Sequence, residues 1–162
     1  MDSNASEKKS GEERDLTEGL LMRVIVLTDG KPECKEVPLP LPLQGEVLIK
    51  VFASQVSEGD LTFSKNPSLC GFSGSGLVIA SGGGWFSNWN IVNTRVAFIS
   101  NSKGNYGTWA EYIVLPAQNC VKLEENVSFS QAALGFSDAL RTIGMLEMVQ
   151  NAKSNVVVQT SG

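Results

Sequence analysis

The spacing of hydrophobic residues changes once along this chain, near residue 127, and that change limits the folds it can adopt. Before it, short apolar runs alternate with polar residues, and Gly-rich or Asn-rich turns separate the runs. Such runs are typical of β-strands, and several at short intervals predict a small barrel or sandwich. The predicted strands cover residues 21–27, 46–56, 76–81, 94–100 and 109–115.

Two connecting segments are expected between the first two of these strands. Residues 28–33 (TDGKPE) have the composition of a turn. Residues 38–46 (PLPLPLQGE) contain three prolines, which cannot donate backbone hydrogen bonds to a neighbouring strand. The second segment is therefore predicted to be an extended connector.

After residue 127 the apolar residues follow a helical period. Ser128 and Gln131 have the spacing of a capping box, in which two side chains bond backbone N–H groups at a helix start. Ser137 is predicted to cap a second helix. Four apolar residues then recur at helical spacing and predict one apolar face: Ala139, Ile143, Leu146 and Val149.

The chain ends in VVVQTSG (156–162), three β-branched residues followed by the start of a turn. An uninterrupted apolar strand is typical of a parallel sheet that is covered on both faces. The predicted fold is therefore mostly β with some α. A β barrel is followed by helices and by the first strand of an α/β sheet.

Composition excludes several classes of function. The net charge of −4 argues against nucleic-acid binding, which needs a basic surface. No apolar run approaches the roughly 18 residues needed to span a bilayer. The chain has no histidine, which excludes a Ser-His-Asp triad, a Cys-His pair and any histidine-ligated metal. Cys34, Cys70 and Cys120 lie far apart and are expected to be buried or reduced thiols.

Residues 1–20 are predicted to be a disordered tail. They contain no apolar segment of the kind found in a secretory signal, and residues 1–19 hold six acidic against three basic side chains. The structured part is expected to begin near Met22. These features predict a cytoplasmic protein, or a mitochondrial one if the natural N-terminus differs.

Six segments together are similar to the medium-chain dehydrogenase/reductase family, in its order and at about its spacing. They are MRVIVLTDG, GEVLIKVFASQVSEGD, GFSGSGLV, TRVAF, GTWAEYIVLPA and VSFSQAALGF. The resemblance covers about residues 22–162. It implies a GroES-like domain over 21–127, then linking helices and the first strand of an incomplete Rossmann domain over 128–162. It also implies NADPH or NADH as cofactor, and a homodimer when the protein is full length.

The resemblance points to the zinc-independent branch of that family. Ser57 stands at the first zinc-ligand position, and Phe72 and Ser73 stand at the second. A hydroxyl and a phenyl ring cannot replace a thiolate and an imidazole on zinc, so no zinc is expected. The branch reduces an activated C=C bond of an enone, enoyl thioester or quinone by hydride transfer.

Three functions follow as alternatives. The GTW of residues 107–109 and the VVQTSG ending are closer to enoyl-thioester reductases, which we favour, whereas AEY at 110–112 favours quinone reductases. The third is a non-enzymatic GroES-like binding or interaction protein. It is motivated by departures from the family pattern, such as Leu140 in place of a threonine.

The resemblance assigns three candidate catalytic residues. Ser57 and Asp60 match the residues that follow the long strand and approach substrate and nicotinamide; the alternative is a turn hydroxyl and a turn carboxylate. The family's tyrosine is missing from the next segment, where Phe63 is the aromatic residue. Tyr106 is the candidate to replace it from another strand, although packing is the commoner role of a strand tyrosine.

The cofactor-binding candidates lie near the C-terminus. Ser137 matches a residue that approaches the nicotinamide amide. Thr160, Ser161 and Gly162 match the start of the turn that binds pyrophosphate at a helix N-terminus. Because the rest of that turn and its helix lie beyond these residues in the family, we expect this chain alone to bind the cofactor weakly or not at all.

Overall fold

A computed structural model describes residues 19–57, 70–83, 91–100 and 106–151 of the chain. Within them, seven strands precede one long helix. The elements are β1 (Leu21–Thr28), β2 (Lys31–Pro38), β3 (Glu46–Ser54), β4 (Ser73–Ser81), β5 (Arg95–Ile99), β6 (Tyr112–Pro116), the short 3-10 helix η2 (Ala117–Asn119), β7 (Cys120–Lys122) and α2 (Phe129–Asn151).

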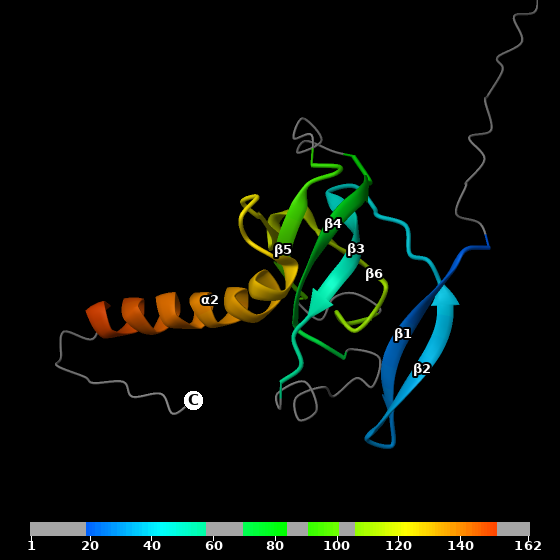
Figure 1. Cartoon of the computed structure of the whole chain (residues 1–162), viewed down its shortest axis with the longest axis horizontal. Coiled ribbons are helices and arrows are strands. Elements are labelled where there is room, and N and C mark those ends of the chain that lie inside the picture. The colour runs from blue at the N-terminus through cyan, green and yellow to red at the C-terminus, as the bar shows by residue number, and fades with distance from the viewer. Residues whose placement is uncertain (1–18, 58–69, 84–90, 101–105, 152–162) are drawn as a thin grey trace, which may run out of the picture.

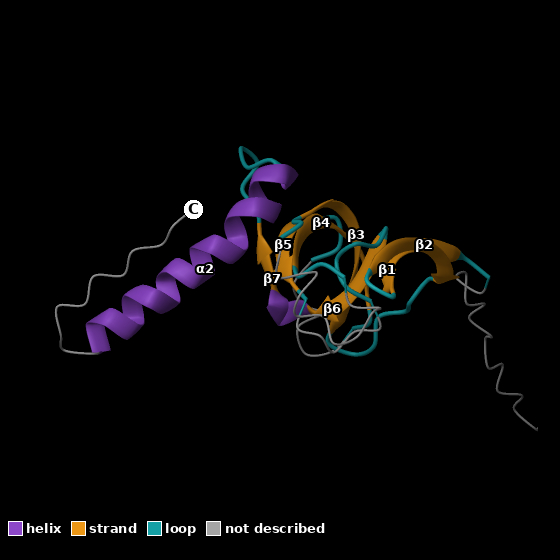
Figure 2. Cartoon of the chain, turned by 90° about the horizontal axis from the view of Figure 1, so that it is seen from below, coloured by secondary structure: helices purple, strands orange, loops and turns teal. Residues whose placement is uncertain are grey.

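The strands form two antiparallel sheets. A five-stranded sheet has the order β6-β3-β4-β5-β7, and β1 pairs with β2 in a separate hairpin. The five-stranded sheet curves around its own core, and α2 leaves it to one side (Figures 1 and 2). The Pro-rich residues 39–45 form no strand, as predicted. The mostly β barrel with a following helix is the predicted fold.

The β1–β2 hairpin corrects the predicted turn over residues 28–33. The turn is shorter, because Asp29 and Gly30 both have positive φ and already reverse the chain. Positive φ at two successive residues is the mark of the tight turn that suits the twist of a hairpin. Strand β2 was not predicted, because its sequence does not alternate between apolar and polar residues. Nearly all its side chains are exposed, so no buried face imposes that alternation.

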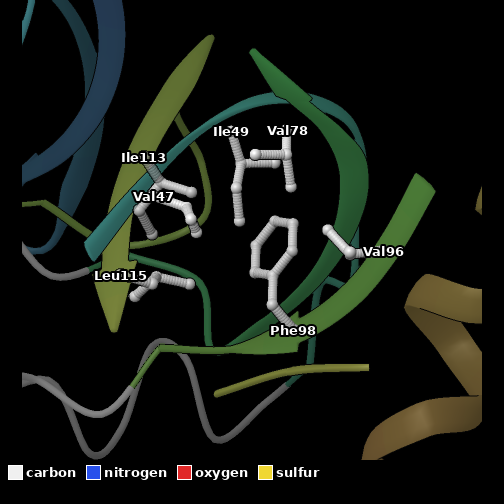
Figure 3. Packing of buried hydrophobic residues seen from close by; sticks show 7 residues of the cluster. All are labelled: Val47, Ile49, Val78, Val96, Phe98, Ile113 and Leu115. Atoms are coloured by element: carbon white, nitrogen blue, oxygen red, sulfur yellow. The ribbon is translucent and has the colours of Figure 1, made fainter. Parts of the chain in front are cut away.

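The main core lies inside the curved sheet. The Phe98 ring of β5 fills its centre (Figure 3). Six aliphatic side chains surround this ring and are also buried: Val47, Ile49, Val78, Val96, Ile113 and Leu115. They come from β3, β4, β5 and β6, so burial of this cluster closes four strands around one centre.

Strand β4 begins with the sequence SGSG, in which glycine and serine serve opposite faces. A Cβ on Gly74 would lie 2.9 Å from the Phe98 ring, and one on Gly76 would lie 2.1 Å from the Lys50 carbonyl oxygen. The two glycines therefore let the Phe98 ring and the β3 backbone approach closely. We predicted close packing and positive φ for the glycines of GFSGSG; only Gly71 has positive φ, because the other two lie within the strand.

Helix α2 begins with the predicted capping box. Gln131 N–H donates to Ser128 Oγ at 3.2 Å, and Ser128 N–H donates to Gln131 Oε1 at 3.0 Å. The predicted second N-cap at Ser137 is wrong, because one unbroken helix runs from Phe129 to Asn151. No helix in the described part of the chain is long and apolar enough to cross a membrane.

The predicted apolar face of α2 is not covered by the barrel. Ile143 and Leu146, which belong to that face, are 54% and 56% exposed. The buried residues of the helix, Ala132 and Ala133, both lie near its start. Only the first part of α2 therefore packs on the barrel, and the rest extends from it (Figure 1).

Arg95 fastens the turn that precedes α2. Its guanidinium donates to the backbone carbonyls of Glu124, Glu125 and Val127 at 3.3, 3.1 and 2.5 Å. It also lies 4.7 Å from the ring centroid of Phe129, a cation–π distance. One side chain of β5 thus fixes the direction in which the chain enters the helix.

An ion pair and backbone hydrogen bonds join the hairpin to the barrel. Glu111 accepts from Arg23 Nε at 3.0 Å and from the Arg23 backbone N–H at 2.8 Å. The backbones also pair, since Ile25 N–H donates to the Trp109 carbonyl at 2.8 Å. The hydrogen bonds from Arg23 hold the pKa of the Glu111 carboxyl below its ordinary value of 4.5.

Replacement of Gly76 by alanine tests the close approach of β3 and β4. Because the new methyl group would meet backbone atoms that cannot swing aside, we expect unfolding to become easier by about 3 kcal/mol. Gly144→Ala is the control, since nothing lies within 4 Å of its Cβ position in α2; it should stabilise by up to about 1 kcal/mol. Urea denaturation measures both, and equal midpoints would contradict the packing role of Gly76.

The Glu111 ion pair predicts a pH-dependent effect of Glu111→Gln. The folded-state pKa is lowered, so the carboxylate stabilises the fold above about pH 4.5 and loses that effect as pH falls through the folded pKa. The variant should therefore be slightly less stable than the parent at neutral pH and equally stable in acid. Both groups are exposed, so the difference is small. A difference that grows toward acid would contradict this assignment.

Candidate functional site

Four segments far apart in the sequence meet at the end of β3. They are the end of β3 itself, the start of β4, the loop 107–109 and the first half of α2. Gln55, directly after β3, bonds to the other three. Its N–H donates to the Ser73 carbonyl at 3.0 Å, its carbonyl accepts from Trp109 Nε1 at 3.0 Å, and its Oε1 accepts from Ser137 Oγ at 2.7 Å.

A pair of hydroxyl groups lies beneath this junction. Ser54 Oγ and Thr108 Oγ1 are 2.6 Å apart, and both reach the Ser73 carbonyl at 3.3 Å. The Thr108 side chain is fully buried. Hydrogen bonds between buried hydroxyls are costly to break, because a group left without a partner keeps its desolvation penalty. The pair therefore fixes the loop against the end of β3.

The GTW sequence at 107–109 explains how the loop comes so close. A Cβ on Gly107 would lie 2.1 Å from the Cys70 carbonyl oxygen, and one on Gly71 would lie 2.3 Å from Thr108 Oγ1. The backbones then pair, with Trp109 N–H donating to the Cys70 carbonyl at 3.0 Å. Gly71 also has a φ of 87°, which favours glycine.

Two exposed apolar side chains flank the junction. Val56 follows Gln55, and Phe72 precedes Ser73, so each neighbours one residue of the Gln55–Ser73 hydrogen bond. They are 71% and 52% exposed. Apolar surface beside hydroxyl and amide groups is typical of sites for small conjugated molecules.

The structure places two of the predicted site residues, Ser57 and Ser137, at this junction. Ser57 is half-buried, two residues after Gln55, and Ser137 is hydrogen-bonded to Gln55. Tyr106 instead packs against the cluster of Met22 and its β1 neighbours, which is the packing role weighed for it.

The remaining predicted site residues are Asp60, Thr160, Ser161 and Gly162, and they lie outside the described residues.

Ser57, Phe72 and Ser73, at the positions of the family's zinc ligands, do not form a set of zinc-binding side chains. Ser73, at one of them, is buried and donates its hydroxyl to the Ala133 carbonyl at 3.0 Å. In the described ranges no three His, Cys, Asp or Glu residues gather in a group that could hold a metal ion. Burial raises the pKa of the Cys120 thiol to about 12, so it stays protonated and is a poor ligand and nucleophile.

Gln55 and Thr108 were missed by sequence reasoning. Gln55 follows a strand end and Thr108 lies in a loop, so neither carries a motif, and their partners are 18 to 82 residues away in the chain. The GTW sequence was the available signal. That sequence indicates a family, but it does not indicate which atoms Trp109 and Thr108 bond.

A family model described as the alcohol dehydrogenase GroES-like domain matches residues 43–125. Zinc-type alcohol dehydrogenase-like protein C337.11 of Schizosaccharomyces pombe is 31% identical over 123 residues, which cover 67% of this chain and 36% of that protein. Synaptic vesicle membrane protein VAT-1 homolog-like of Mus musculus is 28% identical over 87% of this chain and 36% of its own length.

Among solved structures, one provisionally assigned as an NADPH:quinone reductase from Mesorhizobium loti is 25% identical, with a TM-score of 0.72. The match covers 82% of this chain and 45% of that one. The fold and the matched family model thus define a GroES-like domain of the alcohol dehydrogenase type. The chain belongs to the alcohol dehydrogenase GroES-like family, within the medium-chain dehydrogenases/reductases. It spans little more than a third of the two curated relatives.

Thr108→Val tests the buried hydroxyl pair. Valine keeps the shape of threonine but removes both hydrogen bonds, so we expect a loss of about 1–2 kcal/mol in unfolding free energy. Thr142→Val is the matched control, because its hydroxyl bonds only to the Asp138 carbonyl on the exposed part of α2; its effect should stay within about 0.5 kcal/mol. Chemical denaturation measures the unfolding free energy of both variants. Equal losses in the two would contradict the stabilising role of the Ser54–Thr108 hydroxyl pair.

Proposed function

We propose that this chain is the substrate-side part of an NAD(P)H-dependent oxidoreductase that reduces a conjugated carbonyl compound, with a quinone as the first substrate to test. Membership of the family supports the general chemistry. The likeness to the Mesorhizobium loti protein supports the quinone and NADPH. No zinc takes part in the proposed reaction, because the family's ligand positions hold Ser57, Phe72 and Ser73.

The junction around Gln55 is the observation that carries this proposal. Hydrogen bonds from three segments hold the end of β3 in place, and Ser57 lies three residues after it. Val56 and Phe72 offer apolar surface to a flat ring. A hydroxyl held beside such a surface can donate to the carbonyl oxygen on which negative charge develops during reduction.

The residues here fit the carboxamide end of a nicotinamide. Ser57 and Ser137 supply hydroxyl groups, which can both donate to and accept from a carboxamide. When bound, the cofactor would supply a hydride. Thr160, Ser161 and Gly162 remain the residues proposed for the pyrophosphate. Asp60 and Tyr106 remain candidates to deliver the proton that completes the reduction.

The uncovered face of α2 supports a role for this chain as one part of a larger unit. Leu140, Ile143 and Leu146 expose apolar surface along one side of the helix, and exposed apolar faces of this kind mark contact surfaces. A cofactor domain packed there would bury it. We therefore propose that the 162-residue chain alone does not bind NADPH with micromolar affinity, which calorimetry measures directly.

An enoyl-thioester reductase is the second candidate, because of the GTW sequence. Within that sequence, Thr108 is hydrogen-bonded to Ser54 and Trp109 to Gln55, and these bonds hold the end of β3 in place. The same arrangement is compatible with an enoyl thioester and with a quinone as substrate. Substrate choice therefore has to be measured.

The function is tested by cofactor oxidation in the longest polypeptide that the gene encodes. NADPH and NADH are each offered with a benzoquinone and with a crotonyl thioester. We expect quinone-dependent oxidation, and a decrease in kcat of about 100-fold in Ser57→Ala, since loss of one donor to a developing oxyanion has that scale.

Ser130→Ala is the matched control, because Ser130 is an exposed serine in the first turn of α2. It should leave turnover unchanged. Turnover of the thioester alone would favour the second candidate. No oxidation with either substrate would support a non-enzymatic binding protein, and full activity of Ser57→Ala would remove the role proposed for Ser57.

A further inference from the structure

Three polar contacts hold one face of α2 against the barrel at intervals of four residues. Ser75 Oγ donates to the Phe129 carbonyl at 2.6 Å, and Ser73 Oγ donates to the Ala133 carbonyl at 3.0 Å. The third contact is the hydrogen bond of 2.7 Å from Ser137 Oγ to Gln55 Oε1. Positions four apart on a helix lie on one face, so the three contacts form a row.

The geometry of strand and helix explains this row. Four helical residues rise by about 6 Å, and two strand residues extend by about 6.6 Å, so the two repeats nearly coincide. Ser75 and Ser73 can therefore each meet a helix carbonyl as the two elements run in opposite directions. Strand β4 begins at Ser73 and offers no further strand position beyond it. Gln55, whose N–H bonds to the Ser73 carbonyl, makes the next contact from the end of β3.

The Gln55–Ser137 contact is the last of the row. Beyond it, the side-chain hydrogen bonds found for the described residues of α2 stay within the helix, from Arg141 and Thr142 to Asp138. Leu140 and Ile143 are already exposed. The last polar contact of α2 with the barrel is therefore at Ser137, and the later part of the helix extends away from the barrel (Figures 1 and 2).

Gln55 is suited to set the direction of the helix at this point. Its N–H and carbonyl are bonded to Ser73 and Trp109, and the preceding Ser54 is bonded to Thr108. Its backbone cannot shift without breaking these bonds. The side chain consequently holds Ser137 at a fixed distance from the strand end that carries Ser57.

We propose that Gln55 is a positioning residue, which fixes the point where α2 leaves the barrel and so the distance between Ser57 and the cofactor-side part of the protein. The role of Gln55 in setting the distance from Ser57 to the cofactor-side part rests on the proposed function. The positioning of α2 does not, because it depends only on contacts within this chain.

Amide hydrogen exchange of the 162-residue chain tests the inference without cofactor or substrate. In Gln55→Leu and in Ser137→Ala, we expect exchange of the α2 amides after Ser137 to become about fivefold faster, since one lost hydrogen bond has that effect on a local opening equilibrium. Amides 132–134 should not change, because the contacts of Ser73 and Ser75 remain.

Three further variants separate positioning from simple packing. Gln55→Glu keeps an acceptor for Ser137 and should restore slow exchange. The double variant Gln55→Leu with Ser137→Ala should match each single one, because the two changes remove the same bond. Ser75→Ala should instead raise exchange at amides 132–134, at the start of the helix.

Unchanged exchange in both single variants would overturn the inference, and so would multiplied effects in the double variant. In the longest encoded polypeptide, Gln55→Leu should raise the KM for NADPH about fivefold and leave the KM for the quinone unchanged. Equal changes in both constants would contradict positioning toward the cofactor side. Absence of turnover in the unsubstituted protein would contradict the proposed function. It would not affect the hydrogen-exchange result, which needs neither cofactor nor substrate.

Discussion

The close approach of β4 to its neighbours is the constraint on which the rest of this structure depends. Gly76 leaves room for the β3 backbone, and Gly74 leaves room for the Phe98 ring at the centre of the core. Alternation then turns Ser73 and Ser75 to the opposite face, where they bond α2. One short segment therefore closes the barrel on its inner face and seats the helix on its outer face.

The candidate site follows from the same segment. The Ser73 carbonyl accepts from Gln55 N–H, and both Ser54 and Thr108 reach it with their hydroxyls. The loop that carries Thr108 and Trp109 is in turn packed on the backbone at Gly71. The loop 107–109 and helix α2 are thus joined to the end of β3 by one set of hydrogen bonds, so a shift of either is resisted by the other.

Prediction from the sequence succeeded where the interactions are local. The Ser128 and Gln131 capping box connects residues three apart, and its hydrogen bonds form as expected. The strands β3, β4, β5 and β6 of the barrel were also predicted, because burial of one face imposes a period of two on their side chains; the short strand β7 (Cys120–Lys122) was not. Strand β2 was missed, since it pairs with β1 but buries almost nothing.

Prediction from the sequence was incomplete where partners are distant in the chain. Ser137 resembles a helix cap in its local sequence, yet α2 continues through it and its hydroxyl reaches Gln55, 82 residues away. Nothing near either residue signals the other. Tyr106 is adjacent to the GTW loop in sequence, but its ring packs on β1.

The sequence by itself determined the family, five of the seven described strands with the helix after them, and the glycines that a close-packed barrel requires. Each of these depends on the chemistry of single residues or on their spacing along the chain. The tertiary structure alone decided that serines alternate with those glycines to hold α2, and that Gln55 joins β3, the GTW loop and the helix. These contacts arise only when the curved sheet brings distant segments within hydrogen-bond distance.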